Sequence, residues 1–181
     1  DPKIRQGLCD AAVALVKQLH GQDPALYNSF GVFRSNMMSL VAPDGGLDFY
    51  DGSLRARDEA GGIIFDKVDY RAYHSHIREE VKPWSYMKFP FLKALGRDQG
   101  WYRVGPLARL QNCGFITTAR AEAARCQFVD AAQGQVVHAP LAFHWARMIE
   151  ALHCAEAIEA LLDDPDLMRG ELMAERADRA G

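Results

Sequence analysis

The sequence lacks the features that define several large classes of protein. No apolar run approaches the ~20 residues that a helix needs to span a bilayer, and the first residues have neither the charged region nor the apolar region of a signal peptide. Lysine and arginine form no continuous basic run, and the formal net charge is -3. We therefore expect a cytoplasmic protein that binds neither membrane nor nucleic acid.

Cysteine is scarce and dispersed. The sequence has four cysteines without a CxxC pair, and no histidine stands at zinc-ligand spacing from any of them. A disulfide framework is typical of small secreted chains, so we expect four reduced thiols here, mostly buried as small apolar groups. These residues are Cys9, Cys113, Cys126 and Cys154.

The composition is that of an ordinary globular domain. The 181 residues are 49% hydrophobic and 25% charged, without internal repeats or low-complexity tracts. We expect a single α+β domain over residues 1–181, in which long helices pack with a small antiparallel β meander. Residues 166–181 are expected to form a further helix or a disordered tail. The helix at the first residue, without an initiator Met, suggests an internal piece of a longer chain.

Capping residues and apolar periodicity predict four helices. The first begins at Asp1-Pro2 and ends before Gly21 and Pro24. The others are expected from Asp69 to Val81, from Thr117 or Thr118 to about Ala132, and from about His138 or Ala139 to Leu162. One face of the first helix is apolar and must pack on another element; its residues are Ile4, Leu8, Ala11 or Ala12, Leu15 and Leu19.

Residues 34–66 have the pattern of short strands. The runs MMSLVA, LDFYDG, SLRARD and GIIFDK are separated by Gly-rich and Asp-Gly turn signals, which predict a three- or four-stranded antiparallel meander. In the third run Ser53, Arg55 and Arg57 alternate with apolar residues. This alternation predicts that one face of the sheet is exposed to solvent.

Two short motifs are typical of catalysis or metal binding, but each has a structural explanation. His74 and His76, followed by Glu80, would hold a metal only on a strand or loop, because residues two apart on a helix point about 200° apart. Ser85 and Lys88 match the S-x-x-K motif, in which the serine and the lysine lie one helical turn apart. Pro90 would end such a helix, however, and neither SDN nor KTG occurs in the sequence. An unrelated small enzyme that uses the histidines and Glu80 remains an alternative.

A third polar set lies along the last predicted helix. Nothing near it would activate a nucleophile, so a buried polar network or a solvated strip is favoured over an active site. We predict no catalytic, cofactor-binding or metal-binding residue in this chain. The members of the set are His144, Arg147, Glu150, His153 and Glu156.

Residues 84–112 mix aromatic and basic side chains with proline and glycine, which predicts a shaped, irregular connection. The motifs WSYMKFPFLK and YRVGPLARL in this stretch are preceded by LDFYDGSLR and followed by HWARMIEALH and DPDL. Together these motifs resemble the large subunit of the soluble bidirectional, NAD-reducing nickel-iron hydrogenases. The resemblance covers residues 47–167 and implies part of that large-subunit fold.

The family resemblance implies a nickel-iron centre that splits dihydrogen, a small iron–sulfur subunit and diaphorase subunits that reduce NAD. The family holds its metals with two cysteine pairs, RxCGxC and DPCxxC, and neither pair is present here. Arg103 and Arg109 do not match the arginine of the family's AP-R-G motif either. We therefore expect an internal fragment of the large subunit that acts as scaffold, holds no cofactor and is inactive alone.

The resemblance also leads to expectations about partners. Trp84, Tyr86 and Lys88 are predicted to contact another subunit of the parent complex. The isolated chain is expected to self-associate, because helix faces that are covered in a parent subunit become exposed in a fragment. A stand-alone, non-catalytic scaffold or assembly module related to hydrogenase large subunits is the alternative.

Overall fold

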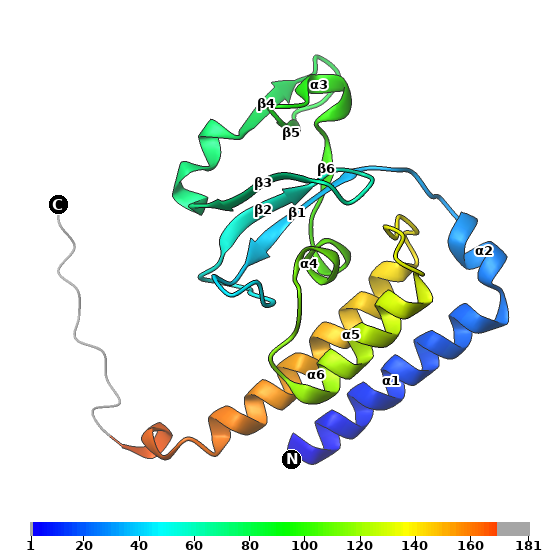
Figure 1. Cartoon of the computed structure of the whole chain (residues 1–181), viewed down its shortest axis with the longest axis vertical. Helices are drawn as coiled ribbons and strands as arrows, with labels where there is room; N and C mark the ends of the chain where they lie inside the picture. The colour runs from blue at the N-terminus through cyan, green and yellow to red at the C-terminus, as the bar shows by residue number, and fades with distance from the viewer. Residues whose placement is uncertain (1, 170–181) are drawn as a thin grey trace.

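The computed structural model describes residues 2–169 as an α+β fold in stacked layers (Figure 1). The predicted α+β class is therefore confirmed. The helices are α1 (Pro2–Gln22), α2 (Pro24–Ser29), α3 (Gly96–Gln99), α4 (Pro106–Asn112), α5 (Ala119–Ala131) and α6 (Ala142–Leu162), with 3-10 helices η1 (Tyr70–Ser75) and η2 (Pro165–Met168). The strands are β1 (Asn36–Val41), β2 (Ser53–Arg57), β3 (Ile63–Val68), β4 (Ile77–Val81), β5 (Lys88–Leu92) and β6 (Tyr102–Arg103).

The main sheet has the strand order β3-β2-β1-β6. The predicted antiparallel meander is present as β1, β2 and β3, but β6 pairs with β1 in parallel, so that the sheet is mixed. The predicted strand LDFYDG does not form. Its Asp48 carboxylate accepts the backbone N–H groups of Tyr50 and Asp51 at 2.6 and 2.9 Å, which turns the chain back toward β2.

Strand β3 contains a bulge next to its partner β2. The register shifts between the pairs Ala56 with Phe65 and Leu54 with Val68, and Lys67 has a φ of 55°. One residue in the left-handed region inside a paired strand is the usual geometry of a bulge, which re-aims the neighbouring side chains.

The predicted helix from Asp69 to Val81 is wrong over most of its length. Asp69 does cap a turn, since its carboxylate accepts the Arg71 N–H at 2.9 Å, but η1 ends at Ser75. Residues from Ile77 onward form β4, which pairs with β5. This pairing is non-local, and a helical period in the sequence does not report it. The stretch of residues 84–112, predicted as an irregular connection, contains β5, which is the second strand of this hairpin, followed by α3, β6 and α4.

The remaining predicted helices are confirmed with shifted ends. Thr118 is the N-cap of α5, and the Gly105-Pro106 turn leads into α4 as expected. Helix α6 begins at Ala142 rather than near His138. Residues 170–181 of the predicted tail lie outside the described residues, and the part before them contains η2.

Helix α1 packs with a different face from the one predicted. Its buried residues Gln6 and Val13 are turned toward the other helices, whereas Ile4, Leu8, Leu15 and Leu19 are exposed. The apolar periodicity of the sequence therefore identified the helix correctly but assigned the wrong side to the interior.

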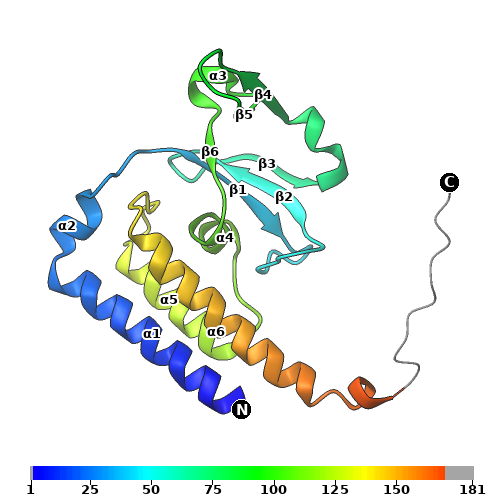
Figure 2. The same ribbon diagram turned by 180° about the vertical axis from the view of Figure 1, so that it is seen from behind.

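Two apolar clusters stabilise the fold, one on each side of the main sheet. The larger cluster joins α4, α5, α6 and α1, with Leu110, Ile149 and Trp145 almost fully buried. The smaller joins one face of the main sheet to the β4–β5 hairpin through Ala56 and Leu92. Both views show the sheet lying between the hairpin and the helices (Figures 1 and 2).

Among the residues that the structure describes, no helix is long and apolar enough to cross a membrane. The two longest helices, α1 and α6, each have 21 residues.

Ile149→Ala is expected to lower the free energy of unfolding by about 2–5 kcal/mol, because it leaves a cavity in a fully buried layer. Ile158→Ala is the matched control on the same helix, where the side chain is 37% exposed. Urea denaturation measures both variants. Equal losses in the two variants would contradict this description of the core.

Candidate functional site

The side chains of β2 divide between two interiors rather than between an interior and solvent. Leu54 and Ala56 are buried against the hairpin side of the sheet. Arg55 and Arg57 point to the opposite face, which was predicted to be exposed. Helix α4 covers this face, so both arginines are only partly accessible. The prediction of a wet face was wrong, because alternation in one strand does not show what packs on its polar side.

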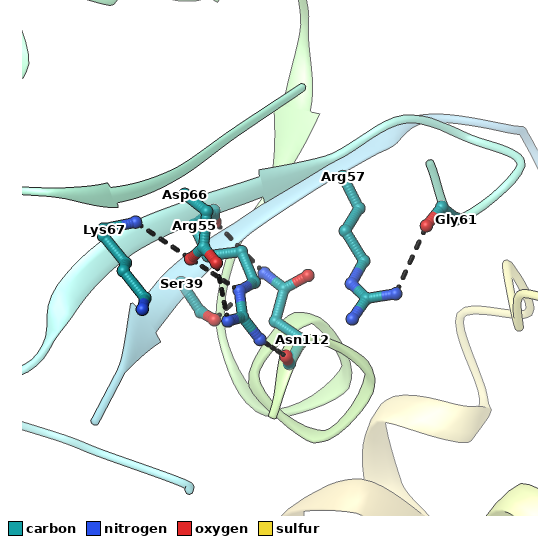
Figure 3. Close-up of polar contacts among 7 residues, drawn as sticks. All are labelled: Ser39, Arg55, Arg57, Gly61, Asp66, Lys67 and Asn112. Carbon is teal, nitrogen blue, oxygen red and sulfur yellow. Dashed lines mark hydrogen bonds and ion pairs between the residues drawn. The ribbon is translucent and has the colours of Figure 1, made fainter. Parts of the chain in front are cut away.

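Arg55 forms the centre of a polar junction between the sheet and α4 (Figure 3). Its Nε and Nη2 atoms donate to the two oxygens of Asp66 at 2.8 and 2.9 Å, and Nη1 donates to the Asn112 carbonyl at 2.9 Å. The guanidinium beside Asp66 holds the pKa of that carboxyl below its ordinary value. The Arg55 guanidinium is therefore held in place by Asp66 on one edge and by the Asn112 carbonyl on the other.

Asn112, the last residue of α4, is fully buried in the same junction. Its Nδ2 donates to Ser39 Oγ at 3.0 Å and to the Arg55 carbonyl at 3.3 Å. The side chain therefore connects α4 to β1 and β2 at once. None of the groups in this junction is placed to transfer a proton or attack a substrate, and its chemistry is structural.

Arg57 lies beside a cavity of about 340 Å³ between β2, α4 and α5. Its Nη1 donates to the Gly61 carbonyl at 3.2 Å, while its buried Nε has no hydrogen-bond partner in the described part of the chain (Figure 3). Arg125 also lines the cavity, but Glu122 binds its Nε and Nη2 at 2.7 and 2.8 Å. The cavity thus presents donors and apolar walls without an activated nucleophile.

Cys113 lines the same cavity and is unreactive there. Burial raises the pKa of its thiol to about 11, so it stays protonated near neutral pH. The prediction that most cysteines are buried was wrong, because Cys126 and Cys154 are exposed and Cys9 is intermediate. All four cysteines are unpaired, as expected.

The pKa of the two exposed thiols is also raised. For Cys126 the main cause is its hydrogen bond to Glu122, and for Cys154 it is partial desolvation of the thiol. A thiolate is the form that binds a transition metal. The four cysteines are dispersed singly along the sequence, and the described residues contain no group of three or more His, Cys, Asp and Glu side chains that could hold a metal ion, so they do not fit the paired donor set of a nickel-iron centre.

The polar residues of α6 form separate structural contacts. Glu150 accepts two hydrogen bonds from Arg109, at 2.7 and 2.8 Å, inside the helical core. His153 Nδ1 lies 3.0 Å from Thr118 Oγ1, and burial lowers the pKa of this histidine. Glu150 and His153 therefore belong to a partly buried polar network, which is one of the two structural interpretations of this set.

Glu156, the last polar residue of this set on α6, binds the start of the neighbouring helix α5. Glu156 accepts the backbone N–H groups of Arg120 and Ala121 at 3.0 and 2.9 Å, at the start of α5. A carboxylate in this position compensates the positive end of the helix dipole. His144 and Arg147 are 3.5 Å apart at the surface and take no part in these contacts.

His74, His76 and Glu80 do not converge. The His76 ring lies 4.7 Å from the Phe65 ring, whereas Glu80 forms ion pairs with Lys82 at 2.8 Å and Arg97 at 3.6 Å. Within residues 2–169 no group of three or more His, Cys, Asp and Glu side chains could hold a metal ion. The geometry does not support a small enzyme built on these residues.

The S-x-x-K match is also without catalytic geometry. Ser85 Oγ accepts the Met87 N–H at 3.0 Å in the hairpin loop. Lys88 lies on β5, where its Nζ is 3.1 Å from a Glu79 carboxylate oxygen. The serine and the lysine have different partners, so no base is placed beside the hydroxyl.

The predicted partner residues lie at the tip of the β4–β5 hairpin. Trp84 is 74% exposed and Tyr86 is 99% exposed, while the Trp84 ring keeps a contact with Phe89 at 5.4 Å between centroids. Figures 1 and 2 both show this hairpin at the end of the molecule away from α1. The structure thus presents two large aromatic side chains on a projecting element.

Arg103 has a purely structural position. Its guanidinium donates to the carbonyls of His138 and Phe33 at 2.5 and 2.9 Å and lies 3.9 Å from the centre of the Phe33 ring. The contact attaches the segment before β1 to β6.

The sequence analysis did not identify the junction residues Asp66 and Asn112. The available signal was Asn112, a polar residue at the end of the mainly apolar helix α4.

The chain is similar to a segment of hydrogenase subunits. No protein-family model matches the sequence. Sequence and structure comparisons nevertheless agree on one class of protein, and the matched relatives are much longer: the chain spans about a third of the curated relatives described next.

Among the relatives is the NAD-reducing hydrogenase HoxS subunit beta of Cupriavidus necator, 40% identical over 88% of this chain and 32% of its own length. An F420-non-reducing hydrogenase iron-sulfur subunit of Archaeoglobus profundus is 33% identical over 81% of this chain and 31% of its length. A crystal structure of an NAD+-reducing [NiFe]-hydrogenase in the H2-reduced state matches with a TM-score of 0.88 and 53% identity. It covers 97% of this chain and 39% of that chain.

These comparisons correct the assignment to a large catalytic subunit. One matched protein is named as a beta subunit and the other as an iron-sulfur subunit, and neither name describes a large subunit. The motifs that carried the resemblance identify the hydrogenase class, but short motifs do not distinguish between subunits. The large-subunit assignment and the large-subunit fold are therefore withdrawn, and similarity to a hydrogenase subunit replaces them.

Acidification is expected to remove the stabilisation that Asp66 provides. The folded pKa of Asp66 lies below its ordinary 3.8, so the unfolded chain takes up the proton first as the pH falls. The contribution is complete above the unfolded pKa and is lost as the pH falls through the folded pKa. Asp66→Asn should cost about 2 kcal/mol at pH 7 and lose less stability than the native chain between pH 5 and 3.

Urea denaturation across this pH range measures the effect, with the exposed Asp163→Asn as the matched control. The native chain and the control should show the same pH slope. If the stability of Asp66→Asn fell with pH as steeply as that of the native chain, the Arg55 contact would not perturb the Asp66 carboxyl.

Proposed function

We propose that the chain is a segment of a subunit of an NAD-reducing nickel-iron hydrogenase, a complex that oxidises dihydrogen and reduces NAD. The observation that carries this proposal is the 53% identity to the solved NAD+-reducing hydrogenase over 97% of the chain. The polar groups described above form contacts that stabilise the fold, which is consistent with a part that supports the complex. The implied partners are the other subunits of the complex, including a diaphorase.

Within this complex the segment acts as scaffold and supplies no ligand to a nickel-iron centre. Such a centre requires paired thiolates, whereas the cysteines of this chain are dispersed, and no group of three or more His, Cys, Asp and Glu side chains among the described residues could hold a metal ion. The chain is therefore inactive by itself, and activity belongs to the assembled enzyme.

The β4–β5 hairpin is the element proposed to contact another subunit. Five cross-strand pairs fix it, and Lys93 attaches it to η1 through hydrogen bonds from its backbone N–H to the His76 carbonyl at 2.8 Å and from Nζ to the His74 carbonyl at 2.5 Å. A rigid hairpin loses little conformational entropy on docking. Exposed Trp and Tyr side chains are the residue types that dominate the binding energy of protein interfaces.

The first experiment is elemental analysis of the purified chain for nickel and iron. The expected content is far below one metal ion per chain, because the described residues bring no three or more His, Cys, Asp and Glu side chains together in a group that could hold a metal ion. Loading with nickel or iron salts at neutral pH should not change that result. Stoichiometric metal would show that the chain builds a site of its own and would overturn the scaffold assignment.

A second experiment tests the hairpin in the assembled hydrogenase. Trp84→Ala is expected to weaken binding of the other subunits by about 30-fold or more, since a buried aromatic at an interface contributes about 2 kcal/mol or more. Tyr86→Ala and the charge reversal Lys88→Glu should weaken it less. The measurement is the affinity between the variant subunit and its partners by biolayer interferometry.

Tyr50→Ala serves as the matched control, because Tyr50 is 83% exposed on a loop between β1 and β2, away from the hairpin. Unchanged affinity in all three hairpin variants, with normal thermal unfolding, would remove the hairpin from the interface. Hydrogenase activity of the complex need not change for the test to be decisive.

A further inference from the structure

Two buried polar atoms beside the junction of the sheet and α4 have no hydrogen-bond partner in the described part of the chain. They are Nε of Arg57, which is a donor, and Oδ1 of Asn112, which is an acceptor. An unpaired buried donor or acceptor is costly, and the cost is greater when the group carries a charge. Two such atoms in one region of the interior therefore indicate a further group that pairs with them.

The two atoms face each other. Strand β2 places Arg55 and Arg57 on the same face, which α4 covers. Figure 3 shows the Asn112 carboxamide between these two arginines, with its oxygen turned toward the Arg57 guanidinium. Arg57 Nε and Asn112 Oδ1 do not hydrogen-bond directly, so the space between them suits a third group that binds both.

The orientation of the Asn112 carboxamide is fixed by its other neighbours. Its Nδ2 donates to Ser39 Oγ at 3.0 Å and to the Arg55 carbonyl at 3.3 Å. Rotating the carboxamide by half a turn would place Oδ1 against the Arg55 carbonyl oxygen, and neither oxygen can donate. Oδ1 therefore stays on the Arg57 side, where it needs a donor.

The other arginines of the interior show which partner Arg57 lacks among the described residues. Each of three donates Nε and Nη2 to the two oxygens of one carboxylate; they are Arg55, Arg109 and Arg125. Arg57 instead donates Nη1 to the Gly61 carbonyl at 3.2 Å, and no carboxylate binds its Nε. The adjacent Asp58 carboxylate is held by its own turn, where it accepts two backbone N–H groups at 2.9 and 2.7 Å.

The chemistry of the two atoms selects the third group. A carboxylate would satisfy Arg57 but would place its negative oxygens against Asn112 Oδ1, which is unfavourable. A water molecule accepts from one side and donates to the other. The cavity of about 340 Å³ borders Arg57 and both sequence neighbours of Asn112, Gln111 and Cys113. It has ample room for a water, which takes about 30 Å³ in the liquid.

We infer that a buried water molecule binds between Arg57 and Asn112, accepting the Nε–H of Arg57 and donating to Oδ1 of Asn112. This bridge extends the polar junction, which then runs from Asp66 through Arg55 and Asn112 to Arg57 and the turn at Gly61. Both protein atoms are buried by elements of this chain. The site is therefore independent of what covers the outer surfaces in a larger assembly.

The native chain gives the first test. A crystal structure at high resolution should show a water within about 2.7–3.2 Å of both Arg57 Nε and Asn112 Oδ1. In NMR at low temperature, the Arg57 Nε–H should show a nuclear Overhauser effect to a long-lived water. The Arg55 Nε–H is the internal control, because it donates directly to Asp66 at 2.8 Å and should show no such signal.

Arg57→Met removes the donor and keeps a long side chain beside the cavity. It should abolish the water signal at the Asn112 side-chain N–H protons. Exchange of these protons should become about 3- to 10-fold faster, the factor that corresponds to one net hydrogen bond. Arg34→Met, at a side chain that is 70% exposed, is the matched control and should change neither quantity. Thermal unfolding checks that both variants fold.

Three results in the native chain would overturn the inference. One is a direct hydrogen bond between Arg57 and Asn112, and another is an anion bound at Arg57 Nε in the crystal structure. The third is an ordered interior in which neither the water nor its NMR signal is found. If Arg57→Met does not fold, the measurements on the native chain still decide the question.

Discussion

The two halves of this fold are joined by one buried polar junction. Asn112 ends α4 inside the molecule and donates hydrogen bonds to Ser39 and to the backbone of Arg55, while Arg55 returns a hydrogen bond to the Asn112 carbonyl. These groups have little access to water, so each lost partner would leave a desolvated donor or acceptor, which is costly. The helices and the sheet therefore hold a defined orientation that apolar contacts alone, which are non-directional, would not specify.

The same principle explains why polar groups that could suggest catalysis have structural roles here. Glu150 neutralises Arg109 in the helical core, and Glu156 caps the start of α5. A buried charge is tolerated when it is paired and hydrogen-bonded. Among the described residues, Arg57 keeps an open donor in its Nε, beside the cavity between the sheet and α5. The fold thus uses these ionisable residues mainly for rigidity.

The aromatic tip of the β4–β5 hairpin stays exposed in the described part of the chain despite this internal pairing. The hairpin lies at the end of the layered molecule away from α1 (Figure 1). It offers large aromatic rings on a rigid ribbon, and such rings suit a specific partner surface.

The sequence by itself determined the α+β class, the first helix, the meander of β1, β2 and β3, and the Thr118 cap of α5, because each depends on local periodicity, turn residues or capping. It also carried the hydrogenase resemblance in motifs such as WSYMKFPFLK. Only the tertiary structure decided that residues from Ile77 form a strand, that the buried side of α1 is the one with Val13, and that Arg55 faces α4. Each of these depends on a partner far away in the sequence, and local propensity is overridden when non-local pairing buries the segment.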